Sequence, residues 1–211
     1  LVLQFVDAQS LHAVVREEGP LDIIDGVSFI RQCAAALHYA HQKGIIHRDI
    51  KPANILVDDR GAPKILDMGL ARLSDEADDV EREDLTVDGS ALGTLSYMSP
   101  EQACNARSVD HRTDIYSLGC TLFFVLTGTA AFRSSAVMRQ LFREVNDQEL
   151  PDLRDLRPEC SDELNDVLAR MIATNPDDRF SSMDEVVDAL DALDVELSEV
   201  EFMGTQDELS D

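Results

Sequence analysis

One short stretch of the chain gathers the residue types that phosphoryl transfer requires. Residues 47–54 read His-Arg-Asp-Ile-Lys-Pro-Ala-Asn, and a further acid, Asp67, follows after two short apolar runs. Catalysis of phosphoryl transfer depends mostly on positioning and on neutralising negative charge. Asp49 can accept the proton of an attacking hydroxyl, and Lys51 can reach a transferring phosphate. The amide oxygen of Asn54 and the carboxylate of Asp67 are hard ligands of the kind that Mg²⁺ prefers.

Apolar patterning predicts a mainly helical domain that positions this stretch. Helical spacing covers residues 27–41 and 161–172, and residues 114–126 are apolar nearly all round, which is typical of a helix buried inside a domain. A capping box, Ser182 to Glu185, opens a last helix. Three short β-prone pieces are separated by polar turns such as Asp58-Asp59-Arg60-Gly61, and these pieces are residues 45–46, 55–57 and 64–66.

The charge balance excludes some classes of function. The 211 residues contain 18 Lys and Arg against 42 Asp and Glu, a formal net charge of −24. General binding to nucleic acid or to an anionic membrane needs clustered positive charge, so we expect neither. No apolar run approaches the roughly 20 residues that a membrane helix needs, and residues 1–10 lack the pattern of a signal peptide. We therefore expect a cytoplasmic segment, whose parent protein can still be anchored to a membrane elsewhere.

The cysteines do not form a recognisable site. The four residues lie far apart and none is in a CxxC pair, and they are Cys33, Cys104, Cys120 and Cys160. Zinc binding and disulfides are open alternatives, but the spacing favours buried thiols in a reducing compartment.

The motifs resemble those of eukaryotic-type protein kinases. Residues 47–54 resemble the catalytic loop H-R-D-x-K-P-x-N, and Asp67-Met-Gly69 resembles the metal-binding D-F-G. Four more motifs follow in the family's order: Gly93-Thr94 with Tyr97, Met98-Ser-Pro-Glu101, Asp114-Ile-Tyr-Ser-Leu-Gly119, and Arg179. Ser-Pro-Glu-Gln in place of A-P-E-x is similar to bacterial Ser/Thr kinases, and Lys51 with Thr94 is the Ser/Thr pattern.

The resemblance implies transfer of the γ-phosphate of ATP to Ser or Thr hydroxyls of protein substrates, with ATP and Mg²⁺ as cofactors. Asp49 would orient the hydroxyl as base and Lys51 would neutralise the phosphoryl group, while Asn54 and Asp67 would hold the metals. The adenine would lie against the backbones of Gln4 and Val6 and the side chain of Leu56.

Four residues have structural roles by the same resemblance. Asp114 would hold the backbone of the catalytic loop by hydrogen bonds, and His47 would pack in the core. Glu101 and Arg179 would form a buried ion pair, for which losing one partner costs about 3–5 kcal/mol.

The resemblance also implies control by phosphorylation. In kinases with this H-R-D arrangement, the arginine, here Arg48, is matched by a phosphate on the activation loop. The hydroxyls in the corresponding position are Thr86 first and Ser90 second, whereas Thr94 would contact the catalytic aspartate. Asp88 is either a fixed partial substitute for phosphate or one more acid in an acidic loop.

The sequence departs from the family at its beginning. No G-x-G-x-x-G is present, and none of the lysines (Lys43, Lys51 and Lys64) lies where the family has its phosphate-clamping strand lysine. The resemblance thus implies a fold that is mainly α, a kinase-like C-terminal lobe with short β-hairpins around the catalytic loop and the N-terminal lobe absent.

The expected boundaries follow from this assignment. Residues 1–6 are the last N-lobe strand and the hinge, residues 7–195 form the C-lobe with an activation segment at 67–101, and residues 196–211 are an acidic disordered tail. We expect the 211-residue chain alone to be inactive and to depend on an N-terminal lobe as partner. The alternative is a non-catalytic kinase-like binding or scaffold module, and a weaker one is an acidic interaction protein. The intact H-R-D, Asn54 and Asp67 favour the enzyme.

Overall fold

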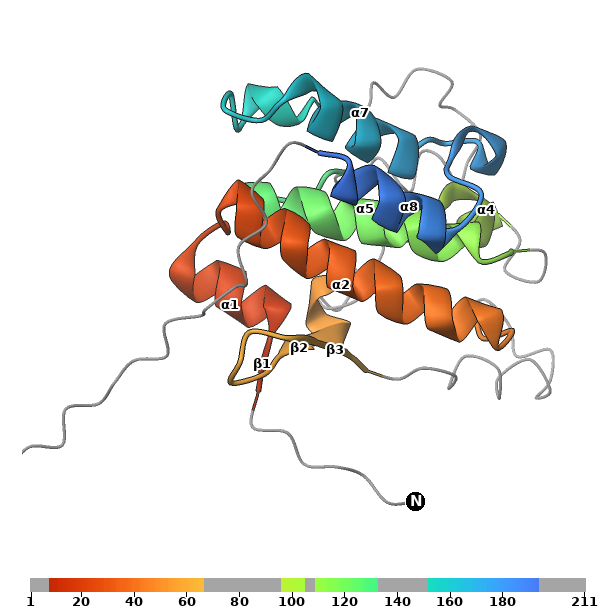
Figure 1. Ribbon diagram of the computed structural model, residues 1–211, viewed down its shortest axis with the longest axis horizontal. Coiled ribbons are helices and arrows are strands. Elements are labelled where there is room, and N and C mark those ends of the chain that lie inside the picture. The colour runs from red at the N-terminus through yellow and green to blue at the C-terminus, as the bar shows by residue number, and fades with distance from the viewer. Residues whose placement is uncertain (1–7, 67–95, 105–108, 133–151, 194–211) are drawn as a thin grey trace, which may run out of the picture.

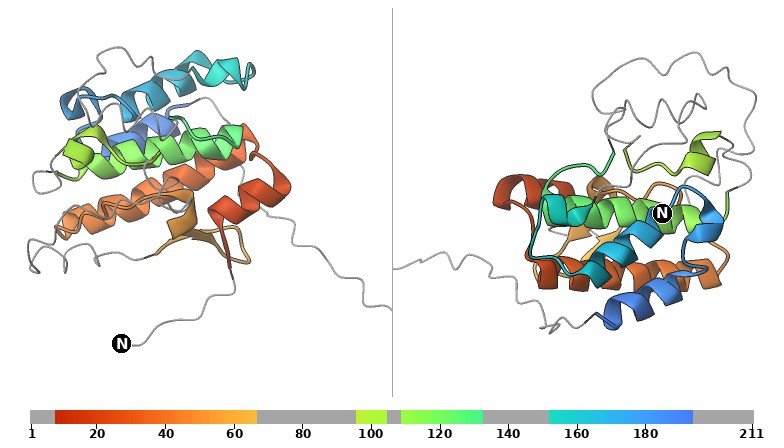
Figure 2. Two further views of the ribbon diagram at one scale, coloured as in Figure 1. Left: turned by 180° about the vertical axis from the view of Figure 1, so that it is seen from behind. Right: turned by 90° about the horizontal axis from the view of Figure 1, so that it is seen from above.

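The structure, a computed structural model, describes residues 8–66, 96–104, 109–132 and 152–193. Helices dominate this part of the chain and pack in layers (Figures 1 and 2). A small sheet and α1 (Leu11–Glu18) lie on one side of the long helices α2 (Ile23–Gln42) and α5 (Arg112–Thr127). On the other side lie α7 (Asp162–Met171) and α8 (Met183–Asp191). The mainly helical character that the sequence predicts is confirmed.

Helix α5 is the centre of the bundle. Every residue from Thr113 to Leu126 is buried, which confirms the prediction of a helix that is enclosed on all sides. Helices α2 and α7 both contact α5. At Gly119 a Cβ atom would lie only 2.6 Å from Ile172 Cγ2, so this glycine lets α7 approach closely. The helix ends at Gly128, whose φ of 69° requires the left-handed conformation that glycine tolerates.

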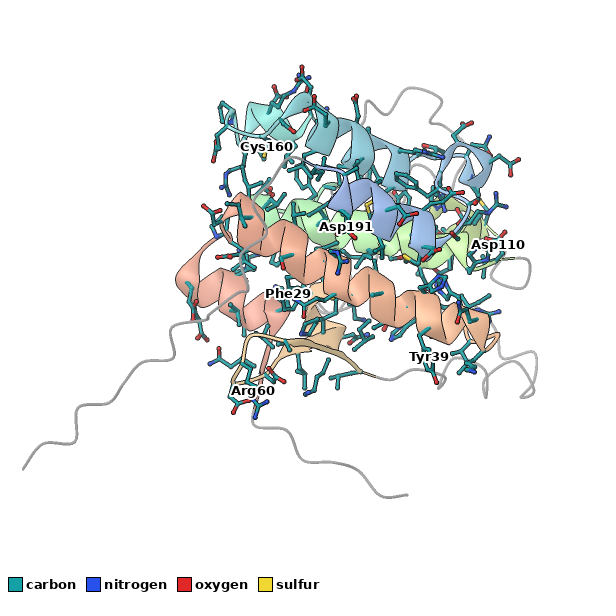
Figure 3. All side chains as sticks on the ribbon, viewed as in Figure 1. Phe29, Tyr39, Arg60, Asp110, Cys160 and Asp191 are labelled. Atoms are coloured by element: carbon teal, nitrogen blue, oxygen red, sulfur yellow. The ribbon has the colours of Figure 1, made fainter. Side chains whose placement is uncertain are left out.

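Helix α2 is longer than the predicted span of 27–41. The carboxylate of Asp22 caps its first turn by accepting a hydrogen bond from the backbone N–H of Ile24, at 3.1 Å. The chain leaves the helix at Gly44, which has a φ of 73° and donates its N–H to the His41 carbonyl, as the Lys43-Gly44 stop predicts. The buried face of α2 packs against α5 and α8. Tyr39 projects from its outer face (Figure 3).

The last two helices begin at serine caps. The Ser161 hydroxyl accepts the N–H of Leu164 at 3.2 Å, and the Ser182 hydroxyl accepts that of Glu185 at 3.2 Å. In the predicted capping box the Glu185 carboxylate would return to the cap residue itself. It instead accepts the N–H of Ser181, one residue earlier, at 2.9 Å. Asp191 at the other end of α8 pairs with Arg31, which fastens α8 to α2 (Figure 3).

The sheet has three short antiparallel strands in the order β1-β2-β3. They are β1 (Gln9–Ser10), β2 (Ile55–Val57) and β3 (Pro63–Ile65), with Ile55 opposite Ile65. The predicted polar turn joins β2 to β3, and the Asp58 carboxylate accepts the N–H groups of Arg60 and Ala62 there. Lys64 pairs with the same carboxylate at 3.0 Å, and this hydrogen bond from Lys64 lowers the pKa of Asp58.

The predicted strand at residues 45–46 is wrong. The N–H of Ile45 bonds to the Ala40 carbonyl at the end of α2, at 3.1 Å. The N–H groups of His47 and Arg48, which follow Ile46, bond to the Asp114 side chain. With these donors engaged elsewhere, the segment does not join a ladder.

Helix α1 and strand β1 are additions that the sequence patterning did not predict. Ser10 caps α1 by accepting the N–H of Ala13 at 3.2 Å, and Leu11, Val14 and Val15 are buried. The pair of β-branched valines is atypical of helices, but their burial against the rest of the domain outweighs this local preference.

None of the helices in the described ranges is both long enough and apolar enough to cross a membrane. All four cysteines are free; Cys33, Cys120 and Cys160 are buried, as predicted, whereas Cys104 is exposed. The prediction of buried thiols is therefore wrong for Cys104, which lies at the end of α4 (Pro100–Cys104), a helix of only five residues. The predicted segments 1–6 and 196–211 lie outside the described residues.

Candidate active site

The loop of residues 47–54 brings three of the predicted active-site residues into contact. It runs from the end of α2 to β2 and finishes in the short 3₁₀ helix η1 (Pro52–Asn54). Lys51 Nζ lies 2.9 Å from Asp49 Oδ2, and Asn54 Nδ2 donates to the same oxygen at 2.7 Å. The Asp49 side chain is 47% exposed and that of Lys51 18% exposed. The cluster is therefore fixed by its own contacts and is open to a ligand.

These contacts give the two carboxylate oxygens of Asp49 different surroundings. Oδ2 receives both the Lys51 ammonium and the Asn54 amide, whereas Oδ1 is not engaged by these two contacts. Asn54 Nδ2 also donates to the Asp49 backbone carbonyl at 2.9 Å. Because its nitrogen faces Asp49, the Asn54 amide directs its oxygen, the atom that binds hard cations, away from this pair.

Asp114, at the start of α5, holds the backbone of the loop. Its carboxylate is fully buried and accepts the N–H of His47 at 2.9 Å on Oδ2 and that of Arg48 at 2.8 Å on Oδ1. His41 Nε2 donates a third hydrogen bond to Oδ2, also at 2.8 Å. The first two contacts are those predicted from the resemblance. That with His41 was missed, since the sequence showed only a histidine without obvious partners.

Arg48 has a backbone conformation that is costly for a residue with a side chain. Its φ is 68°, and among the described residues no other non-glycine residue has a positive φ. Such conformations cost of order 1–3 kcal/mol and persist where surrounding contacts enforce them. The hydrogen bond from Arg48 N–H to Asp114 is one of those contacts.

His47 connects the loop to the segment that leads to Asp67. Its buried ring donates from Nε2 to the Leu66 carbonyl at 2.7 Å, because a carbonyl can only accept. Nδ1 is then the acceptor, and it receives the N–H of Asp49 at 3.2 Å. The imidazole thus fixes the peptide that carries the candidate base, which adds a specific contact to the predicted packing role.

A second polar connection reaches the loop from α4. Gln102 Nε2 donates to the Arg48 carbonyl at 2.6 Å, and Gln102 Oε1 accepts from the Thr113 hydroxyl at 3.1 Å. The Ser99 hydroxyl lies 2.6 Å from that of Thr113. Sequence reasoning assigned no role to these residues. The only available signal was the position of Gln102 directly after Ser-Pro-Glu.

The predicted pair of Glu101 and Arg179 is present and bidentate. The two terminal nitrogens of Arg179 donate to the two Glu101 oxygens at 2.7 and 2.8 Å. The guanidinium is 0% exposed, and its other N–H groups donate to the carbonyls of Ala173, Arg112 and Thr174. All five donors of this buried cation are therefore satisfied.

The other predicted site residues are not part of the cluster of Asp49, Lys51 and Asn54. Leu56 is in β2, opposite Lys64, and is partly buried. The remaining predicted adenine, metal and regulatory residues lie outside the described residues, and they are Gln4, Val6, Asp67, Thr86, Asp88, Ser90 and Thr94. The described part of the site is therefore the cluster of Asp49, Lys51 and Asn54 with its supports.

Comparison with known proteins agrees with this geometry. Residues 1–190 match the model of the protein kinase domain. The chain belongs to the protein kinase family. This kinase chain is 36% identical over 187 residues to the serine/threonine-protein kinase PknB of Mycolicibacterium smegmatis, covering 88% of this chain and 29% of the relative. It is 37% identical over 188 residues to PknB of Mycobacterium tuberculosis, with the same coverage.

A relative from another bacterial genus carries the same kind of name. A probable serine/threonine-protein kinase of Clostridium acetobutylicum is 32% identical over 190 residues, covering 90% of this chain and 28% of the relative. The predicted resemblance to bacterial-type Ser/Thr kinases is therefore confirmed. The chain spans less than a third of the length of these relatives.

Proposed function

We propose that this chain is the catalytic-loop part of a Ser/Thr protein kinase that transfers the γ-phosphate of ATP to Ser or Thr hydroxyls of proteins. The observation that carries the proposal is the contact of Asp49 with both Lys51 and Asn54, at 2.9 and 2.7 Å. A structural aspartate in a turn would need no lysine and amide on one of its oxygens. A base for phosphoryl transfer needs both a fixed orientation and a cation close to the transferring group.

Each described residue then has a part in the reaction. Oδ1 of Asp49 accepts the proton of the substrate hydroxyl while the hydroxyl oxygen bonds to the γ-phosphorus. The bond from the γ-phosphorus to the β–γ bridging oxygen breaks, and ADP leaves with that oxygen. Lys51 lies 2.9 Å from Asp49 and can turn its ammonium to the phosphoryl oxygens as their charge develops.

Magnesium would be held by the Asn54 amide oxygen together with Asp67. The described donor fits this role, because the amide nitrogen of Asn54 is engaged by Asp49 and a hard cation takes the oxygen. Bound Mg²⁺ would neutralise the phosphate charge. The adenine would rest on Leu56 and on the backbones of Gln4 and Val6. Catalysis takes place in the cytoplasm, where ATP is present and an exposed thiol such as that of Cys104 stays reduced.

Phosphorylation would control the activity through Arg48, the residue before Asp49. Arg48 would be matched by a phosphate on Thr86, with Ser90 as the second acceptor and Asp88 as a partial substitute. A phosphate brings a charge near −2 and three acceptor oxygens, against a single charge and two oxygens for a carboxylate. Thr94 would contact Asp49. The domain limits at residues 6 and 195 belong to the same proposal.

The direct test is phosphate transfer by the complete protein that contains this chain. The purified protein is incubated with Mg²⁺ and ATP labelled at the γ-position, together with a generic basic protein as substrate. We expect labelled Ser or Thr in the wild type and a loss of at least about 100-fold in Asp49→Asn. Binding of ATP without transfer would support the non-catalytic kinase-like module instead.

The 211-residue chain alone provides a second test. It contains neither a G-x-G-x-x-G sequence nor a lysine in the expected strand position, so only part of an ATP site is present. We expect no transfer and at most weak nucleotide binding. Clear ATP-dependent phosphorylation of the basic protein by this chain would contradict the assignment of its residues to one lobe.

A further inference from the structure

The side chain of Gln102 joins α4 to the catalytic loop over a separation of 54 residues. Its Nε2 group donates a short hydrogen bond, 2.6 Å, to the backbone carbonyl of Arg48. That carbonyl belongs to the peptide between Arg48 and Asp49, which carries the candidate base. The contact is therefore made to a peptide unit that adjoins Asp49, and rotation of this unit would move the Asp49 side chain.

Two buried hydroxyls set the direction in which this amide points. Gln102 Oε1 can only accept, so the Thr113 hydroxyl donates to it at 3.1 Å. The Thr113 oxygen then accepts from the Ser99 hydroxyl at 2.6 Å. Ser99 Oγ in turn receives the backbone N–H of Gln102, at a longer 3.4 Å. Ser99 and Thr113 are fully buried, so water does not compete, and this chain of hydrogen bonds turns the Gln102 amide nitrogen towards the loop.

Neighbouring residues of α5 thus hold both sides of Arg48. Asp114 accepts the Arg48 N–H directly at 2.8 Å, and Thr113 reaches the Arg48 carbonyl through Gln102. The other end of the same peptide, the Asp49 N–H, donates to His47. These contacts surround the positive φ of Arg48, a conformation that reverts where its supports are removed.

We propose that Gln102 is a positioning residue of the catalytic loop, which fixes the Arg48–Asp49 peptide and so the direction of the Asp49 carboxylate. The inference rests on the proposed role of Asp49 in phosphoryl transfer. On this proposal, two adjacent residues of the Ser-Pro-Glu-Gln sequence have different roles. Glu101 anchors α4 to Arg179, and Gln102 passes the position of α4 to the loop.

Hydrogen exchange of backbone amides in the 211-residue chain tests the contact of Gln102 with the Arg48 carbonyl, and it does not require the chain to be catalytically active. Gln102→Glu keeps the acceptor for Thr113 but removes the donor to Arg48, and Gln102→Met keeps the volume without either bond. We expect exchange at Arg48 and Asp49 to become about tenfold faster in both variants. Amides in the middle of α2 and α5 should change less than twofold. Gln32→Met is the matched control, because within the described residues the Gln32 amide donates to the Ser28 carbonyl of its own helix.

Turnover in the complete protein tests the consequence. We expect Gln102→Glu to lower kcat about tenfold while the KM for ATP stays within twofold, since the lost interaction serves the transition state. Thr113→Val, which removes the hydroxyl that orients the amide, should act in the same direction. Thr113→Ser, which keeps the hydroxyl, should restore near wild-type kcat. This pair still gives an answer if a Gln102 variant fails to fold.

The two measurements separate the possible failures. Unchanged exchange at Arg48 and Asp49, or equal acceleration in α5, would overturn the positioning role. So would faster exchange combined with an unchanged kcat in an active protein, or equal kcat in Thr113→Ser and Thr113→Val. An inactive complete protein would contradict the proposed function, while the exchange result would still decide whether Gln102 holds the loop.

Discussion

The helical bundle and the catalytic-loop junction are held together by different forces. In the bundle of α2, α5, α7 and α8, apolar side chains such as Leu118 and Leu122 are fully buried. At the junction, where residues 47–54 meet α4 and the start of α5, the order comes from hydrogen bonds between side chains and backbone. Helix α5 belongs to both regions, because its middle fills the core and its first turn holds the loop.

The difference has a physical consequence for the effects of mutations. Apolar burial contributes about 25 cal/mol per Å² but has no direction, so it stabilises the domain without placing any single atom. A hydrogen bond contributes only about 1 kcal/mol net, but it fixes distance and angle. We therefore expect stability to depend mainly on the bundle and on the buried pair of Glu101 and Arg179. Catalytic geometry should depend mainly on the hydrogen bonds of the junction.

Thiol chemistry should show the largest contrast between the two regions. Burial raises the pKa of Cys120 in α5 to about 12, and burial also raises the pKa of Cys33 in α2. At pH 8 only about one Cys120 in ten thousand would be ionised, and the thiolate is the reactive form. We expect an alkylating reagent to modify only the exposed Cys104 in the folded chain, and none of the cysteines in Cys104→Ser. Mass spectrometry of the digested protein measures this, and rapid modification of native Cys120 would contradict the described packing.

Glu101→Ala should show that one polar contact is as important to stability as the core. It would leave the buried Arg179 guanidinium, 0% exposed, without its carboxylate. We expect the free energy of unfolding to fall by about 3–5 kcal/mol, measured by denaturant titration of the 211-residue chain. Arg154→Ala, which breaks exposed pairs with Asp152 and Asp162 but leaves the Asp152 carboxylate as the cap of residues 153–155, is the control and should have a much smaller effect. Similar small effects from both variants would mean that the buried pair is not a support of the fold.

Gly119→Ala tests the closeness of packing inside the bundle. The added methyl group would lie 2.6 Å from Ile172 Cγ2 and 2.8 Å from Met171 Cβ, so α7 must shift away from α5. We expect a loss of about 1–3 kcal/mol in the same titration. In the double variant Gly119→Ala with Ile172→Ala, the contact with Ile172 Cγ2 is relieved while that with Met171 Cβ remains, so the two losses should add only in part. Fully additive losses would mean that the loss in Gly119→Ala does not come from its contact with Ile172.

Asp49→Asn should have the smallest effect on stability. The side chain is 47% exposed, and an amide of the same shape can still accept from Lys51 and Asn54. We expect a change within about 0.5 kcal/mol, as for surface substitutions in general. A loss near that of Glu101→Ala would mean that the loop carries stability and that the two regions are not distinct.

The elements found from the sequence are those that depend on local patterning. The apolar residues of α5 and the stripe of α7 predicted helices that the structure has, and Ser182 correctly marked the start of α8. These features depend on spacing along one element, which the sequence shows directly. The catalytic-loop residues were also recognisable, because their types and spacing form a continuous motif.

Features that depend on distant partners could not be found in this way. Residues 45–46 are a short apolar run like a strand, but their neighbours bond to Asp114, 67 residues after His47. Gln102 was not assigned because its partner, the Arg48 carbonyl, is a backbone atom with no signature in the sequence. Helix α1 was missed since its two valines favour strands locally and are accommodated by burial.

The most direct test of the account compares two acids in the complete protein. Asp49→Asn and Asp67→Asn are each measured for turnover and, by titration calorimetry, for binding of ATP with Mg²⁺. Asp49 contacts Lys51 and Asn54. If it acts in the transition state as we propose, its variant should lose at least about 100-fold in kcat with nucleotide affinity within twofold. Asp67→Asn should weaken Mg²⁺-dependent ATP binding. If both variants show the same defect in the nucleotide titration, the roles assigned to the two acids are wrong.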